Sequence, residues 1–169
     1  GLAAGFMEPL ESTSIHLTQE SIAQLLNLFP GDEFNQSEID QFNETATRDY
    51  ELIRDFLILH YHANQRDEPF WQQCRDMEIP ASLQQRIAVF KNRGRLFIED
   101  ENLFKMDSWL AVMFGQGITP SNYDPLINRV DSNKATLFLN DTHQAFVRST
   151  LKMPVHDEFV SRYCKASFN

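Results

Sequence analysis

A carboxylate placed directly before a predicted helix is the feature of this sequence best suited to chemistry. Glu11 precedes the hydroxyl run Ser12, Thr13 and Ser14, and such runs are typical of helix starts. The first amides of a helix lack intrahelical partners, so the N–H groups of Thr13 and Ser14 are candidates to hold an anion beside Glu11. That arrangement suits general acid–base catalysis. On spacing alone, however, a charge that complements the helix dipole, with Ser12 as a simple cap, is the more common case.

Helices are expected to position these groups, because apolar residues recur at helical spacing along most of the chain and no strand alternation is sustained. Ser12, Ser37 and Ser82 are the expected N-caps, and Gly94 is an expected helix stop. The covered region is therefore predicted to be mainly α with at most short strands. The expected helices run from about residue 12 or 13 to 29, from 37 to about 61 or 62, from 69 onward, from 82 to 93, from 107 or 108 to 114, from 132 to 151 and from 155 to 164.

The composition excludes several classes of partner. Fifteen Lys and Arg against 24 Asp and Glu leave a formal charge of −9, and the scattered basic residues argue against a nucleic-acid or anionic-membrane surface. The apolar runs are far shorter than a membrane span. Cys74 and Cys164 stand alone without zinc-ligand spacing, so neither a metal site nor a disulfide framework is expected, and a reducing cytoplasm fits the sequence. A chain of 169 residues is expected to form one domain.

Three motifs in order resemble the flavin-dependent tryptophan halogenases. The run GFMEPLESTSI, residues 5–15, is similar to the GF-x-EPLEST segment of that family. His60-Tyr61 followed by RDEPFW, residues 66–71, resembles its HY and R-D-x-P-F-W stretch. Ser108-Trp109 with GQG at 115–117 and Pro120 resembles its SW, GQG and P stretch. Each tryptophan or histidine taken separately is more often an ordinary core or capping residue.

The resemblance implies a mainly α segment that forms the C-terminal helical part of an α/β, FAD-dependent monooxygenase-like halogenase fold. Residues 1–16 would end the flavin-binding module and carry the active-site motif, and residues 17–169 would form the helical, substrate-side domain. In the family, reduced FAD, O2 and halide produce an oxidised halogen species, which a lysine and a glutamate handle beside an electron-rich aromatic substrate. The implied cofactors are FAD and a halide ion. The implied partners are a separate flavin reductase, a small aromatic molecule and a second copy in a homodimer, in the cytoplasm.

The motif match also implies the site residues. Glu11 takes the place of the family's glutamate, and Ser12 lies beside it as the second catalytic position. The halide- and cofactor-binding positions map to Thr13, Ser14, Gly5 and Phe6, the substrate side is expected at Trp109 and Phe104, and no metal ligand is expected.

Three departures from the family pattern bear on function. The G-x-G-x-x-G fingerprint and the catalytic lysine of the family lie upstream of this segment, so the segment by itself is expected to be inactive. Between Arg93 and Ser108, where tryptophan-specific members carry an aromatic-rich stretch, the aromatics are Phe97 and Phe104, so a substrate other than free tryptophan is expected. Position 14 is often glycine in those members and is serine here. A related flavin monooxygenase without halogenation, and a non-catalytic helical interaction module, stay open as alternatives.

Overall fold

The computed structural model describes residue 3, residues 5–98 and residues 102–165, and every regular element within them is helical. This confirms the prediction of a mainly α chain. The chain divides into two compact units, Gly1–Tyr123 and Asp124–Asn169. The elements of the first unit are η2 (Leu10–Ser12), α1 (Thr13–Asn27), α2 (Gln36–His62), α3 (Pro69–Asp76), α4 (Ala81–Arg93) and α5 (Met106–Gly115), and those of the second are η3 (Pro125–Arg129), α6 (Ser132–Thr150) and α7 (His156–Tyr163).

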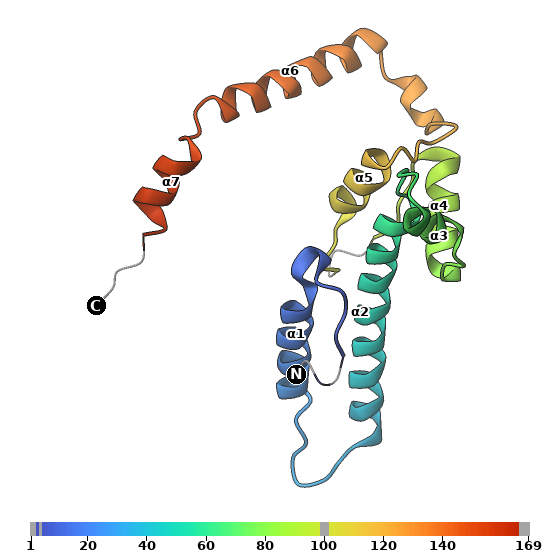
Figure 1. Cartoon of the computed structure of the whole chain (residues 1–169), viewed down its shortest axis with the longest axis vertical. Helices are drawn as coiled ribbons and strands as arrows, with labels where there is room; N and C mark the ends of the chain where they lie inside the picture. The colour runs from blue at the N-terminus through green and yellow to red at the C-terminus, as the bar shows by residue number, and fades with distance from the viewer. Residues whose placement is uncertain (1–2, 4, 99–101, 166–169) are drawn as a thin grey trace. The chain divides into compact units, whose positions relative to one another are not determined.

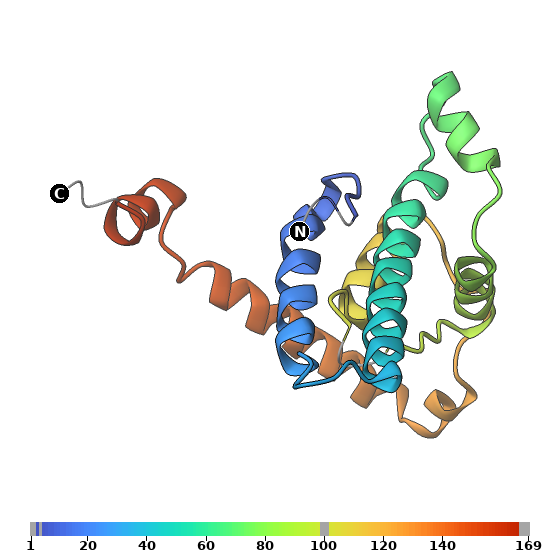
Figure 2. The same cartoon turned by 90° about the horizontal axis from the view of Figure 1, so that it is seen from below.

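The long helix α2 is the centre of the first unit. It pairs with α1 in an antiparallel hairpin and also packs against α3, α4 and α5, as Figures 1 and 2 show. A small cluster of Leu17, Ile53 and Leu57 joins α1 to α2. The larger core lies between α2, α4 and α5. Its buried members are Phe56, Leu59, Ile79, Leu83, Ile87, Phe90, Leu96, Trp109 and Met113.

The helix boundaries follow the expected turn signals, but the serines do not act as the expected caps. The side chain of Asn35, rather than Ser37, caps α2 by accepting from the Ser37 amide at 3.0 Å. Ser82 lies within the first turn of α4 and points to another helix instead of capping its own. Gly94 does end α4 in the left-handed conformation, with φ of 68°, which a residue without Cβ adopts at little cost.

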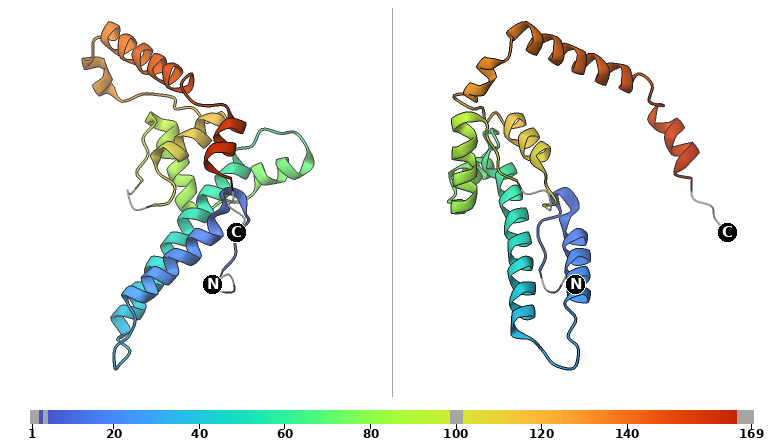
Figure 3. Two further views of the ribbon diagram at one scale, coloured as in Figure 1. Left: turned by 90° about the vertical axis from the view of Figure 1, so that its left-hand side faces the viewer. Right: turned by 180° about the vertical axis from the view of Figure 1, so that it is seen from behind.

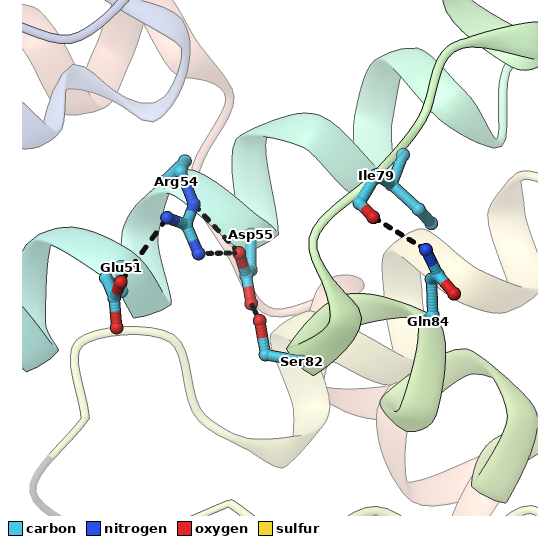
Figure 4. Close-up of polar contacts among 6 residues, drawn as sticks. All are labelled: Glu51, Arg54, Asp55, Ile79, Ser82 and Gln84. Carbon is cyan, nitrogen blue, oxygen red and sulfur yellow. Dashed lines mark hydrogen bonds and ion pairs between the residues drawn. The ribbon is translucent and has the colours of Figure 1, made fainter.

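A buried carboxylate connects α2 to α4 (Figure 4). Asp55 is 2% exposed, and its Oδ2 accepts from Ser82 Oγ at 2.5 Å while its Oδ1 accepts from Arg54 Nη2 at 2.8 Å. Because a buried charge needs partners that replace water, these bonds explain how Asp55 is tolerated there. Arg86 lies over the Trp109 ring at 4.3 Å. Burial lowers the pKa of the Arg86 guanidinium from its ordinary value, and the charge of Asp55 opposes that effect.

One face of α1 is apolar but not covered within the described part of this chain. Ile15, Ile22 and Leu26 recur at helical spacing, and each is at least half exposed. The buried positions of α1 are Thr13 and Leu17, and Leu17 packs against α2. The apolar periodicity of the sequence therefore located the helix, whereas the packing of this segment uses its other side. The right-hand view of Figure 3 shows α1 (blue) beside α2 (cyan).

The second unit consists of η3, α6 and α7. Asp131 caps α6 by accepting from the amides of Asn133 and Lys134, both at 3.0 Å. None of the described residues in these three helices is buried, although α7 carries a contact between the rings of Phe159 and Tyr163 at 4.9 Å. Among the residues that the structure describes, no helix is both long and apolar enough to cross a membrane.

Candidate active site

Glu11 and Ser12 lie in left-handed backbone immediately before α1. Their φ values are 63° and 55°, and they are the non-glycine residues of the described chain with positive φ. A left-handed conformation at a residue with Cβ costs on the order of 1–3 kcal/mol, and such strain gathers at functional sites. The turn is closed by the Ser12 amide, which donates to the Pro9 carbonyl at 2.9 Å. The expected role of the Ser12 hydroxyl as a helix cap is wrong, because no side chain caps the start of α1.

The left-handed turn brings Glu11 to a histidine from the end of α2. Glu11 Oε1 lies 3.7 Å from His60 Nε2, and the two side chains are 45% and 17% exposed. His60 Nδ1 lies 2.8 Å from the carbonyl oxygen of Phe56, one turn earlier in the same helix. The Phe56 ring meets the imidazole edge-on, with centroids 4.9 Å apart. The histidine is thus held on two sides and presents its second nitrogen to Glu11.

The first turn of α1 contains a buried hydroxyl without a partner. Thr13 is 1% exposed, and its Oγ1 has no hydrogen-bond partner. Since a buried polar atom without a partner is costly, this hydroxyl marks a place where a ligand can restore the missing interaction. Ser14 Oγ lies 3.4 Å from the Met7 carbonyl, and the backbone of Ser14 is helical, so this position does not need the freedom of glycine.

Gly5 and Phe6 occupy the segment that leads to this turn. A Cβ at Gly5 would lie 2.8 Å from Cε1 of the Tyr50 side chain, so a larger residue at this position requires the Tyr50 ring to shift. The Tyr50 hydroxyl lies 3.5 Å from the Gly5 carbonyl. Phe6 is 67% exposed. The fit of Gly5 against Tyr50 is a structural reason for this glycine, and the expected cofactor contacts of both residues stay predictions.

Trp109 and Phe104, the expected substrate-side residues, lie together against α2. Trp109 is 2% exposed, and Phe104 stacks on Phe56 with centroids 3.9 Å apart. Both line one pocket, so the structure brings the pair together, although most of Trp109 belongs to the core. Their contact with substrate stays a prediction. The pocket is lined by His16, Glu20, Asp49, Leu52, Ile53, Asn102, Leu103, Phe104 and Trp109.

A second pocket lies on the His60 side of the active-site turn. Its walls include the stacked rings of Tyr61 and Trp71, whose centroids are 5.8 Å apart. The Tyr61 hydroxyl bonds to Glu8, and this bond, together with burial, raises the pKa of Tyr61. The lining residues are Leu10, His60, Tyr61, Asn64, Trp71 and Gln116.

His60 is the site residue that sequence reasoning did not assign. The HY motif singled it out, but the pattern carries no sign that it meets Glu11, because the contact depends on how α2 packs beside the turn. With His60 included, the site combines a carboxylate, an imidazole and an uncapped helix start. Such a set can take up a proton and bind a small anion.

The sequence of this chain matches a family of known proteins. The family model described as tryptophan halogenase matches residues 1–132. The chain is 34% identical to a 7-chloro-L-tryptophan 6-halogenase of Kutzneria, over 96% of this chain and 32% of that protein.

Solved structures show the same helical arrangement. A flavin-dependent halogenase from Xanthomonas campestris matches 100% of this chain and 34% of its own, with 42% identity and a TM-score of 0.90. A flavin-dependent halogenase from Brevundimonas matches 93% of this chain and 32% of its own, with 37% identity and a TM-score of 0.86. The chain spans about a third of the length of the relatives it matches.

Proposed function

The chain belongs to the tryptophan halogenase family, and we propose that it forms the substrate-side part of the active site of a flavin-dependent halogenase. The proposed reaction replaces a hydrogen on an electron-rich, indole-like ring with a halogen and uses reduced FAD, O2 and halide. Residues 1–16 end the flavin-binding module in this proposal, and residues 17–169 form the helical domain beside it. The observation that carries the proposal is the strained turn that sets Glu11 between His60 and the uncapped start of α1.

Glu11 is the proposed base of this reaction. A ring that has accepted a halogen must lose a proton to become aromatic again, and a carboxylate within reach of the ring carbon accepts it. The left-handed backbone at Glu11 and Ser12 supports this role, because strain of this kind fixes a side chain that a relaxed helix start would leave free. Ser12 keeps its place as the neighbouring catalytic position.

The halide is proposed to bind at the start of α1. The amides of Thr13 and Ser14 point along the helix axis toward its positive end, where anions are favoured. The buried, unpartnered Thr13 Oγ1 fits the same ligand, since a hydroxyl hydrogen can donate to a halide. When bound, reduced FAD with O2 supplies the oxidation of the halide, and Gly5 and Phe6 are the proposed contacts with the cofactor.

The substrate is proposed to be a small aromatic molecule other than free tryptophan, beside Phe104 and Trp109. The 93–108 segment lacks the aromatic-rich stretch that the family resemblance associates with recognition of the amino acid, which supports a substrate without that group. A separate flavin reductase is the proposed source of reduced FAD, and a homodimer and a cytoplasmic location complete the proposal. Cys74 and Cys164 are free thiols, in keeping with a reducing compartment.

The test is halide-dependent product formation by the complete protein with a flavin reductase, FAD, bromide or chloride, and a panel of indoles and phenols. We expect halogenated product, and we expect Glu11→Gln to lower its rate by about 100-fold, the scale of a lost general base. Glu44→Gln, at an exposed position of α2, is the matched control and keeps the rate of the unaltered protein. Hydroxylated product without halogenated product, or a Glu11→Gln variant with full activity, would refute the proposal.

A further inference from the structure

We propose that His60 takes the proton from Glu11 after each halogenation and releases it to solvent, so that Glu11 is a carboxylate again for the next turnover. This inference rests on the proposed function, in which Glu11 removes the ring proton. It adds a step that the family's glutamate and lysine do not provide, namely the return of the base to its starting state. Three structural features support this step: the orientation of the imidazole, the position of its second nitrogen and the pocket beside it.

The orientation of the ring decides which nitrogen is free to accept a proton. A carbonyl oxygen only accepts hydrogen bonds, so the 2.8 Å contact with the Phe56 carbonyl requires a hydrogen on His60 Nδ1. A neutral imidazole then carries its lone pair on Nε2, the nitrogen that faces Glu11. The edge-on Phe56 ring keeps the imidazole in this plane.

Whether Glu11 and His60 form a hydrogen bond depends on whether Glu11 carries a proton, because both facing atoms are otherwise acceptors. A carboxylate of Glu11 and the lone pair of His60 Nε2 repel, and the 3.7 Å between them is longer than a hydrogen bond. Once Glu11 holds a proton, its O–H can donate to Nε2. Glu11 is the more exposed of the two side chains, so a small rotation about its side-chain bonds closes the gap while His60 stays fixed.

The transfer balances without any further reagent. The O–H bond of the Glu11 carboxylic acid breaks, and an N–H bond forms at His60 Nε2. The products are a carboxylate and an imidazolium, which attract each other and hold the pair together. The Nε2 proton then passes to water, and His60 returns to its neutral form with the Nδ1 hydrogen still bonded to Phe56.

The pocket behind His60 offers the exit to water. Its volume is about 210 Å³, which is room for several water molecules. The neutral amides of Asn64 and Gln116 and the imidazole itself form its polar wall. The titratable groups on this side are Glu11, Tyr61, the Glu8 carboxylate bonded to Tyr61, and the nearby thiol of Cys74. Arg66 lies over the Trp71 ring at 5.4 Å.

The experiment separates the first turnover from the following ones in the complete protein. His60→Gln places a side-chain amide near the position of Nε2, where it can form a hydrogen bond with Glu11 but does not take up a proton. We expect the single-turnover rate of halogenation and kcat/KM for the aromatic to stay close to those of the unaltered protein. The steady-state kcat should fall by about tenfold to 100-fold, since only the return of Glu11 to its carboxylate is slowed. Added imidazole should restore part of kcat in His60→Ala, and His143→Gln, exposed on α6, is the matched control.

The outcomes distinguish this inference from the proposed function. A steady-state kcat of His60→Gln equal to that of the unaltered protein would show that Glu11 releases its proton without His60. Equal losses in the first and later turnovers, with no rescue by imidazole, would assign His60 a purely structural role. Either result overturns the relay while Glu11→Gln still slows every turnover. If Glu11→Gln is fully active, the proposed function itself is wrong.

Discussion

Replacing Ser12 with glycine tests whether the left-handed turn is strained and whether that strain serves Glu11. Ser12 has φ of 55°, and its hydroxyl does not cap α1. A left-handed residue with Cβ costs about 1–2 kcal/mol, and glycine removes this cost. Glycine also makes the unfolded chain more flexible, which offsets about 0.4–1 kcal/mol of the gain. Ser12→Gly is therefore expected to raise the free energy of unfolding by roughly 0.5–1 kcal/mol.

The assay is urea denaturation of the complete protein, with two control variants. Ser12→Ala keeps Cβ and removes the hydroxyl, so its stability should stay within about 0.5 kcal/mol of the unaltered protein. Ser21→Gly, in the middle of α1, should lower the free energy of unfolding by about 0.5 kcal/mol, the difference in helix propensity. The same Ser→Gly change should stabilise the protein at position 12 and destabilise it at position 21. This difference is due to the left-handed φ at position 12.

Activity supplies the second readout for the Ser12 variants. If the strained turn aims the Glu11 carboxylate, a flexible glycine should lower kcat for halogenation while KM for the aromatic changes little. Ser12→Ala separates the loss of the hydroxyl from the loss of the fixed backbone. A Ser12→Gly variant that is less stable than the unaltered protein by as much as Ser21→Gly would refute the reasoning, because it would mean that position 12 is not left-handed in solution.

Three further substitutions test the elements that support the site. Thr13→Val removes the buried, unpartnered hydroxyl, so in halide-free buffer it should raise the free energy of unfolding by about 1 kcal/mol, while KM for bromide should rise if that hydroxyl holds the halide. An unchanged KM for bromide would exclude Thr13 Oγ1 as a halide contact. Gly5→Ala places a Cβ 2.8 Å from the Tyr50 ring and should cost about 1–3 kcal/mol in urea denaturation, which Tyr50→Ala in the same chain should partly relieve. Asp55→Ala breaks the bonds to Ser82 and Arg54 and should cost about 3 kcal/mol, whereas Glu51→Ala, at an exposed partner of Arg54, should change stability by less than about 0.5 kcal/mol. A near-neutral Asp55→Ala would show that this buried carboxylate does not hold α2 to α4.

Local signals in the sequence were sufficient for the helices. Apolar spacing placed α1, α2, α4 and α6 to within a few residues, and Pro69 and Gly94 marked a start and a stop, because these effects act within one or two turns of backbone. The caps were less predictable. Asn35 took the place expected for Ser37, since any short polar side chain near a helix start can reach the same amides.

The contacts between distant segments were decided by tertiary packing. Ser82 bonds to Asp55 instead of capping α4, and Trp109 is buried between Phe56 and Arg86, because the positions of α2, α4 and α5 leave these side chains facing one another. Periodicity describes which residues share a helix face, but it does not say which face a neighbouring helix covers. For the same reason apolar spacing located α1 but did not show that its apolar face is exposed.

By itself the sequence determined the helical class and, through the run from Gly5 to Ile15, the family and the likeness of Glu11 to its glutamate. Only the tertiary structure decided how that carboxylate is held. Glycine and asparagine are the residues that favour left-handed backbone, and neither occupies position 11 or 12. The left-handed turn at Glu11 and Ser12 is therefore maintained by the surrounding packing. The meeting of Glu11 with His60 likewise requires α2 to return alongside α1, an arrangement that is set by buried contacts such as Leu17 with Ile53 rather than by any local pattern.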